Sequence, residues 1–424
     1  MKASADLLIV NVGQLLTLAG PNEWPRTGRA LREVGLVEGG ALAAADGVII
    51  AAGTAEQVLD EVVLAPGGVR LDAAGAVVLP GLVDPHTHLV FAGSRADEFA
   101  QRLAGATYQE ISRRGGGILA TMRATRAASE DDLVALGRAR LDRLVAHGTT
   151  TVEGKSGYGL TVDDELKLLR VIHRLNALHE VDLVPTFLGA HAVPPEFAGD
   201  PDGYVRLVVE EMIPAVVEED LAEFCDVFCE AGAFSPAQAR AVLTAGAEAG
   251  LEPKIHADEL SDLGGARLAA EVGARSADHL LHASEDGLSA MASSGTMAVL
   301  LPGTAFFLGL PYASARRMIE LGVAVALGTD FNPGTSPGYA MPMAIALACI
   351  GMRLDPAEAI VAATINAAHA IGAAEEVGSL EPGKAADAVI LDLTDYRELP
   401  MAFGTNPVRT VIKRGRVAAR WGGG

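Results

Sequence analysis

Short apolar runs alternate with amphipathic stretches through the middle of the chain. Within stretches such as 129–148 and 163–180, apolar residues recur three to four positions apart, which predicts helices beginning after the N-cap residues Ser129 and Thr161. Among these stretches lie eight β-like runs, at residues 76–85, 149–154, 181–191, 225–234, 252–260, 276–283, 296–303 and 323–334. Because strands alternating with helices form a parallel sheet covered by helices, eight such units predict a closed (β/α)8 TIM-type barrel.

The two ends of the chain show a different pattern, with short strands broken by glycine and polar turns and little helix signal. Residues 1–70 and 376–424 therefore predict one small β-sandwich domain built from both termini, with the barrel formed by residues 71–375. A barrel of this type takes roughly 250 residues. The 424 residues of the chain accommodate both domains.

Composition narrows the class of protein. Half of the residues are hydrophobic, which suits a large core, and no apolar stretch reaches the roughly 18 residues of a membrane helix. The formal net charge of −21 makes nucleic acid and anionic membranes poor partners, and an anionic substrate would need a local cation. Three cysteines, an odd number, and an N-terminus without an export signal favour reduced thiols and a cytoplasmic location.

Ionisable residues concentrate at the predicted strand ends. The chemistry of a (β/α)8 barrel takes place at the C-terminal ends of its strands, so side chains far apart in the sequence are expected to meet at one opening. The residues concerned are Asp84, His86 and His88 after strand one, His191 after strand three, His256, Asp258 and Glu259 after strand five, His279 after strand six, and Asp330 after strand eight.

Four of these residues form a candidate metal site. In an extended segment, His86 and His88 point to the same side because side chains alternate with period two. That motif alone is weak evidence, but His256 and Asp330 complete a set of three nitrogens and one oxygen with an open position, which zinc or iron accepts. Asp84 suits two roles equally, as a ligand or as the partner that orients an imidazole.

The remaining histidines have plainer interpretations. The helical patterns predict that they are solvated or structural, and they are His147, His173, His179, His282 and His369. The segment 154–159, GKSGYG, has glycines like a phosphate loop but lacks the GxxxxGK[ST] spacing, so no nucleotide site is expected.

The segments PGLVDPHTH, HTHLVFAGSRADEF, FLGAHAVPPEF, KIHADEL and GTDFNPGTSP together resemble the amidohydrolase superfamily over nearly the whole chain, and within it the imidazolonepropionase family. The resemblance implies hydrolysis of the cyclic amide of 4-imidazolone-5-propanoate, a small anionic substrate, to N-formimidoyl-L-glutamate in histidine degradation. It also implies one zinc or iron ion per subunit and a homodimer. Two-metal members carry a carboxylated lysine after strand four; here Cys229 and Glu230 stand there, which favours one metal, although Glu230 leaves a second metal possible.

The resemblance also assigns roles to residues. The implied metal ligands are His86, His88, His256 and Asp330. The implied substrate contacts are Arg95, Tyr158, His191, Glu259, Asn332, Gly334 and Thr335.

The chemistry of amide hydrolysis suggests how these residues act. Asp330 is expected to move the proton of the attacking water to the leaving nitrogen, and His279 to donate to the carbonyl oxygen. Glu259 is the rival base, or it holds the ring N–H. Arg95 can bind the propionate bidentately. Glycines 115–117 are a possible hinge of a lid.

Two other functions remain open from the sequence. A cytosine- or guanine-type deaminase would share the metal ligands but would have no use for Arg95 as a carboxylate clamp. A non-catalytic barrel would use the metal and the histidines only to stabilise a scaffold.

Overall fold

The computed structural model describes residues 2–106, 110–111 and 115–420. Its centre is an eight-stranded sheet in which every neighbouring pair is parallel, in chain order from β6 to β13. The strands are β6 (Leu82–Asp84), β7 (Thr149–Lys155), β8 (Asp182–Ala190), β9 (Phe224–Cys229), β10 (Glu252–Ala257), β11 (Ser276–His279), β12 (Met297–Leu300) and β13 (Val325–Leu327). A parallel bridge between Thr87 and Phe331 joins the first strand to the last, and this confirms the predicted barrel.

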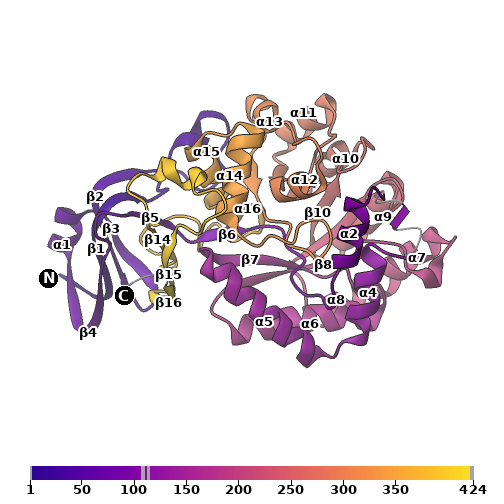
Figure 1. Ribbon diagram of the computed structural model, residues 1–424, viewed down its shortest axis with the longest axis horizontal. Helices are drawn as coiled ribbons and strands as arrows, with labels where there is room; N and C mark the ends of the chain where they lie inside the picture. The colour runs from indigo at the N-terminus through magenta and orange to yellow at the C-terminus, as the bar shows by residue number, and fades with distance from the viewer. Residues whose placement is uncertain (1, 107–109, 112–114, 421–424) are drawn as a thin grey trace.

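Helices cover the outside of the barrel (Figure 1). The two helices predicted from their periodicity are confirmed as α5 (Glu130–Ala146) and α6 (Val162–Leu178), capped by the hydroxyls of Ser129 and Thr161. The others are α2 (Ala96–Leu103), α4 (Ile118–Ala127), α7 (Pro201–Leu207), α8 (Ile213–Glu218), α9 (Pro236–Glu248), α10 (Gly265–Glu271), α11 (Glu285–Ser294), α12 (Pro302–Leu308), α13 (Ala315–Leu321), α14 (Met341–Met352), α15 (Pro356–Ala362) and α16 (Ile365–Ala370). Shorter helical segments are η1 (Gly28–Arg32), η2 (Pro195–Phe197), η3 (Val208–Met212) and η4 (Tyr396–Met401). Within the described part of the chain, no helix is both long and apolar enough to span a bilayer.

Strands from both termini form a second, mixed sheet at one end of the molecule, where both chain ends also lie (Figure 1). Its strands are β1 (Ala3–Leu16), β2 (Leu36–Ala45), β3 (Val48–Thr54), β4 (Val62–Asp72), β5 (Val77–Pro80), β14 (Ala388–Leu391), β15 (Val408–Lys413) and β16 (Arg416–Arg420). The sheet encloses one core in which Leu7 of β1 clusters with Ile412 of β15. Val58, on the unpredicted helix α1 (Ala55–Glu61), joins a second cluster with Leu8. The predicted association of the two termini is confirmed.

One predicted strand is divided between the two sheets. The run 76–85 was expected to be a single barrel strand, but it is two: β5 pairs with β1 and β14, and β6 pairs with β7. The prediction was wrong because residues 77–83 are all apolar or glycine and all buried, so hydrophobicity does not mark the division between two cores. The break falls at Gly81, whose N–H donates to the carbonyl of Asp387 at 2.9 Å.

Gly81 leaves no room for a side chain. A Cβ there would lie 2.1 Å from Oγ1 and 2.6 Å from Cγ2 of Thr150, which is β-branched and fully buried. We therefore expect Gly81→Ala to lower the free energy of unfolding by about 1–3 kcal/mol, measured by urea denaturation. Gly338→Ala is the matched control, because a Cβ at Gly338 meets nothing within 4 Å. Equal denaturation midpoints for the two variants would contradict the steric argument.

Candidate active site

A cavity of about 380 Å3 lies at the C-terminal ends of the barrel strands. The predicted site residues that line it are His88, Arg95, Tyr158, His191, His256, Glu259, His279, Asp330, Asn332 and Thr335. His86 is fully buried beside His88 and His256, and Gly334 packs against Arg95. The structure thus brings together side chains that the sequence separates by more than 200 positions.

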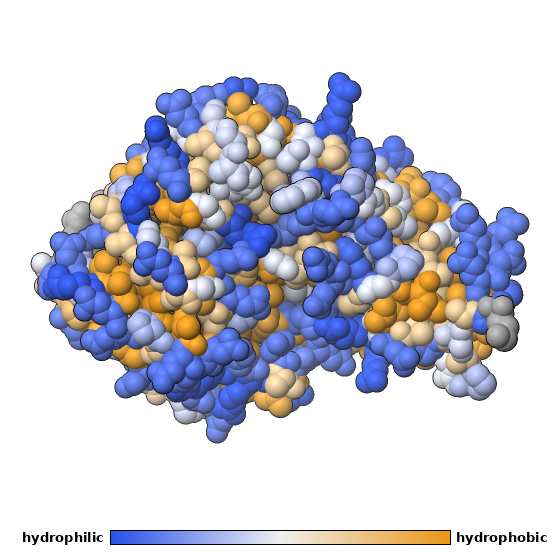
Figure 2. Space-filling view, turned by 180° about the vertical axis from the view of Figure 1, so that it is seen from behind, coloured by the Kyte–Doolittle hydropathy of each residue, from blue (hydrophilic) through white to orange (hydrophobic). Residues whose placement is uncertain are grey.

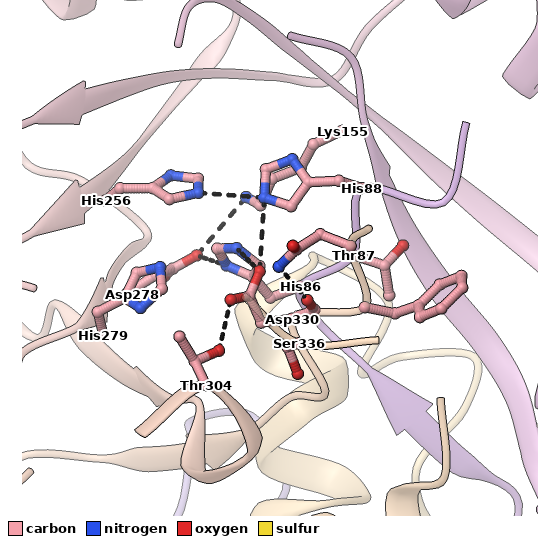
Figure 3. A network of polar contacts seen from close by, with 12 residues as sticks. His86, Thr87, His88, Lys155, His256, Asp278, His279, Thr304, Asp330 and Ser336 are labelled. Atoms are coloured by element: carbon pink, nitrogen blue, oxygen red, sulfur yellow. Dashed lines mark hydrogen bonds and ion pairs between the residues drawn. The ribbon is translucent and has the colours of Figure 1, made fainter. Parts of the chain in front are cut away.

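The four predicted metal ligands form one buried cluster, drawn in Figure 3. Oδ1 of Asp330 lies 3.5 Å from Nε2 of His86 and 3.6 Å from Nε2 of His88. Nε2 of His256 lies 3.4 Å from Nε2 of His88. Donor atoms about 2.0–2.2 Å from one tetrahedral ion are themselves separated by a little over ~3 Å, and the contacts among His86, His88 and Asp330 fit this spacing. Within the described residues these three form one group of potential ligands, while His86 and His256 form a second group with His279.

The hydrogen bonding of His86 also fits a metal ligand. Its Nε2 is buried and has no hydrogen-bond partner within the described residues, although buried nitrogens normally have one. Burial, with a further contribution from cationic Lys155, holds the pKa of His86 well below its usual value. Burial does the same for His88, with His191 adding to the effect. Both imidazoles are therefore neutral, the form that coordinates a metal.

Two carboxylates that the sequence analysis did not single out orient the imidazoles. Asp278 Oδ2 lies 2.6 Å from Nδ1 of His86, and Asp226 Oδ2 lies 3.0 Å from Nδ1 of His256. Because a carboxylate accepts hydrogen bonds, the contact with Asp278 puts the N–H of His86 on Nδ1 and leaves its Nε2 as the electron-pair donor. Asp226 lies beside Nδ1 of His256, which makes no hydrogen bond with the described residues. Asp84, considered for this role, instead accepts from the N–H and hydroxyl of Thr329 at 3.0 and 2.5 Å, so it fixes the end of β13.

The strand ends turn sharply where they carry polar residues. Asp258, His279 and Asp330 all have positive φ, at 50°, 77° and 53°, which is strained for residues with a side chain. Hydrogen bonds hold the turn at Asp330: its N–H donates to the carbonyl of His86 at 3.0 Å, and its Oδ2 accepts from the hydroxyl of Thr304 at 2.5 Å. Oδ1 is thereby directed at the histidines.

Glu259 and His279 face each other on one side of the cavity, with Oε1 and Nδ1 3.7 Å apart. Burial raises the pKa of Glu259 to about 8, with contributions from Asp330 and Glu230. Burial also holds the pKa of His279 well below its usual value. At neutral pH, Glu259 therefore carries a proton that it can donate, and His279 is neutral.

Glu230, considered as a ligand of a second metal, is occupied elsewhere. Its Oε2 accepts from the N–H groups of Leu260 and Ser261 at 2.8 and 3.2 Å, and its Oε1 accepts from the N–H of Ala231 at 2.7 Å. Its carboxylate fixes the loop after β10 that carries Glu259, which is a structural task rather than metal binding.

Arg95 is held on two sides. Its Nε donates to Oε2 of Glu98 at 2.8 Å, and its guanidinium packs so closely on Gly334 that a Cβ there would lie 1.9 Å from Nη1. The amide oxygen of Asn332 accepts from the N–H groups of Gly334 and Thr335, both at 2.8 Å, and so shapes the loop that backs the guanidinium. Asn332 is thus engaged within its own loop.

The opposite wall is fixed by a buried acid. Glu165 of α6 accepts from the N–H groups of Gly157, Gly159 and Leu160 at 2.9, 2.7 and 2.7 Å, and thereby holds the loop that carries Tyr158. His191 stacks on His88 with ring centroids 5.0 Å apart, and its Nδ1 donates to the carbonyl of Gly157 at 2.9 Å. The Nε2 of His191 is therefore an acceptor.

Residues 112–114 of the glycine-containing loop lie outside the described residues. The N–H of Gly117 donates to Oε1 of Glu98 at 3.0 Å, so the carboxylate that holds Arg95 also contacts this loop. Its closure as a lid stays a prediction. The histidines expected to be solvated or structural do not line the described part of the cavity.

Comparison with known proteins identifies related sequences. The profile of the amidohydrolase family matches residues 77–418. Imidazolonepropionase of Symbiobacterium thermophilum is 58% identical over 414 residues, 97% of each chain. Imidazolonepropionase of Geobacillus kaustophilus is 54% identical over 418 residues, 98% of each chain.

Solved structures share the fold at much lower identity. An adenosine deaminase from Xanthomonas campestris with bound zinc has a TM-score of 0.72 at 19% identity, covering 98% of this chain and 93% of that one. Escherichia coli guanine deaminase has a TM-score of 0.71 at 16% identity, covering 98% of this chain and 99% of that one. At such identities the similarity establishes the fold alone.

The contact between Arg95 and Gly334 gives a test of the cavity. The methyl group of Gly334→Ala would displace the guanidinium, so this variant should bind an imidazole carrying a propionate side chain at least about tenfold more weakly. Its affinity for imidazole without the carboxylate should stay within about twofold of wild type. Calorimetric titration measures both, with Gly338→Ala as the control. Equal losses for the two ligands would show that Gly334 does not act through a carboxylate clamp.

Proposed function

This chain belongs to the amidohydrolase family, in its imidazolonepropionase branch, and from this we propose that the cavity hydrolyses the ring of 4-imidazolone-5-propanoate to N-formimidoyl-L-glutamate. The observation that carries the proposal is the location of Arg95 in the same cavity as His88, His256 and Asp330. An amide-cleaving centre and a carboxylate-binding cation then address the two ends of one substrate.

The metal site proposed here holds one zinc or iron ion on His86, His88, His256 and Asp330. The buried, unpartnered Nε2 of His86 and the donor set of three nitrogens and one oxygen support it. A metal ion in such a set supplies Lewis acidity and lowers the pKa of water. Both metals suit this donor set, so elemental analysis must identify the ion.

Asp330 is the proposed proton carrier. Thr304 holds its Oδ2, so the carboxylate keeps one orientation while it takes a proton from the attacking water and passes it to the leaving ring nitrogen. His279 is neutral and lines the same cavity, where it donates a hydrogen bond to the carbonyl oxygen as negative charge develops. A neutral imidazole is sufficient for this role of His279.

Arg95 binds the propionate of the substrate. A guanidinium matches a carboxylate bidentately, and this local cation offsets the unfavourable formal charge of −21 of the whole chain. Glu259, protonated at neutral pH, binds the imidazolone ring, with a role as base as the alternative. The remaining proposed substrate contacts are Tyr158, His191, Asn332, Gly334 and Thr335.

The other candidate functions are not favoured. The deaminases that share the fold are only 16–19% identical, whereas the imidazolonepropionases are 54–58% identical over almost the full chain. A scaffold barrel without activity would not need Arg95 held between Glu98 and Gly334 inside the cavity.

We also propose a cytoplasmic homodimer. Figure 2 shows hydrophobic patches among hydrophilic side chains on one face of the molecule. Ile350 of α14, Met401 of η4 and the nearby Phe403 are exposed apolar side chains of the kind that a subunit interface covers. Light scattering in solution distinguishes the dimer from a monomer.

The direct test is turnover together with metal content. Purified protein should remove the absorbance of 4-imidazolone-5-propanoate and contain about one zinc or iron ion per chain. His86→Ala should lose both the metal and the activity, because one of four ligands is missing. His282→Ala is the matched control, since His282 is exposed and does not line the cavity.

Two results would contradict this proposal. Stoichiometric metal retained by His86→Ala would remove that residue from the ligand set. Deamination of cytosine or guanine by the wild-type protein, without turnover of the imidazolone, would favour a deaminase.

The pKa of Glu259 gives a pH test of its role. A proton donor with a pKa of about 8 is active below that pH and loses its proton above it, so kcat/KM should fall as the pH rises through 8. Glu259→Gln keeps an N–H donor that does not titrate, and this alkaline decline should disappear while kcat falls by less than about tenfold. A loss of about 10²–10⁴-fold in kcat would instead identify Glu259 as the general base.

A further inference from the structure

A cluster of buried charges lies beside the proposed metal ligands. It contains Lys155, Lys254, Glu153, Asp226 and Asp278, all with side chains that are 0% exposed. Charges this deep are stable only with partners of opposite sign. The two aspartates lie against the imidazoles of His256 and His86, but the proposed reaction gives no role to the lysines.

Lys155 contacts both of these aspartates. Its Nζ donates to Oδ2 of Asp226 at 2.7 Å and lies 3.5 Å from Oδ2 of Asp278. These are the same two oxygens that contact Nδ1 of His256, at 3.0 Å, and Nδ1 of His86, at 2.6 Å. One ammonium group therefore adjoins both contacts between an aspartate and an imidazole Nδ1, and Figure 3 draws its ion pair with Asp278.

We propose that Lys155 is a positioning residue for the metal centre. Asp226 of β9 and Asp278 of β11 are like charges that approach a common point inside the barrel, where the low dielectric strengthens their repulsion. The ammonium between them offsets this repulsion and fixes the positions of both carboxylates. Both imidazoles then keep the N–H on Nδ1, so that Nε2 of His86 faces Asp330 and Nε2 of His256 faces Nε2 of His88.

Lys254 provides an internal comparison. It is equally buried and pairs with Oε1 of Glu153 at 2.8 Å, while Lys155 pairs with Oε2 of the same carboxylate at 3.0 Å. Its other hydrogen bonds, at 3.3 and 3.4 Å, go to the carbonyls of Pro85 and Ala370. In the described structure it makes no hydrogen bond or ion pair with either aspartate, so its removal disturbs the same cluster without freeing those carboxylates.

The inference rests on the proposed metal site but not on the substrate, so it is tested by metal binding alone. Lys155→Met and Lys254→Met each replace a buried lysine by an uncharged side chain of similar length. The dissociation constant for Zn²⁺ is measured on each folded protein by competition with a chelator at one fixed pH, and stability is measured by urea denaturation. We expect both variants to unfold at lower urea concentration.

Zn²⁺ affinity separates positioning from structure. Lys155→Met should bind Zn²⁺ about 10–100-fold more weakly, the usual cost of losing a group that orients metal ligands, while Lys254→Met should stay near wild type. Unchanged affinity in Lys155→Met would overturn the inference. Equal weakening in both variants would also overturn it, because the effect would then follow general destabilisation.

A measurement on the wild-type protein does not depend on either variant folding. ¹⁵N NMR of the metal-free protein with labelled histidine should show His86 and His256 as the Nδ1–H tautomers, each assigned by the signal lost when that histidine is replaced by glutamine. Nε2–H tautomers would overturn the inference. Failure of the wild-type protein to bind Zn²⁺ at all would instead contradict the proposed function.

Discussion

The contact of Asp278 with His86 and of Asp226 with His256 is the constraint on which the rest of the site depends. An imidazole has two nitrogens, and only one of them can face the cluster, so the other must be fixed by an acceptor. The two aspartates supply that acceptor from β11 and β9, the strands on either side of β10, which carries His256. Rigid strands, rather than loops, therefore determine the direction of the Nε2 atoms of these histidines.

The sequence predicts the barrel well, because its strands and helices leave local signals, and it also picks out residues that the structure brings to one cavity. Apolar runs followed by capped helices identify the strands, and His86 and His88 stand directly after such a run. The structure brings His256, His279 and Asp330 to the same cavity because all barrel strands run in one direction.

The orienting groups were missed because their partners are distant in sequence: Asp278 lies 192 positions from His86. A signal exists nonetheless. Asp226 and Asp278 stand inside strands that are almost entirely buried, and a buried charge needs a partner. The sequence does not identify that partner as Lys155. The sequence also did not show that 76–85 divides into two strands. Its apolar residues suit the core of either domain equally, so no local signal marks the break.

Carboxylates that accept backbone N–H groups fix the loops around the cavity. Glu165 holds the loop of Tyr158, Glu230 holds the loop after Glu259, and Glu98 joins Arg95 to the loop of Gly117. These contacts engage acidic groups that would otherwise repel an anion. They explain how a strongly acidic chain can keep one guanidinium directed at its cavity.

Few backbone hydrogen bonds join the first and last strands of the barrel within the described residues. Thr87 and Phe331 form one bridge. The N–H of His88 donates to the carbonyl of Phe331, and the N–H of Asp330 donates to the carbonyl of His86. His86 lies on one side of this junction and Asp330 on the other. A metal ion bound by both His86 and Asp330 would cross-link the segments that follow β6 and β13. Metal binding would then stabilise the junction between the first and last strands, which few hydrogen bonds join. Folding of the barrel would thereby be thermodynamically coupled to assembly of the metal site.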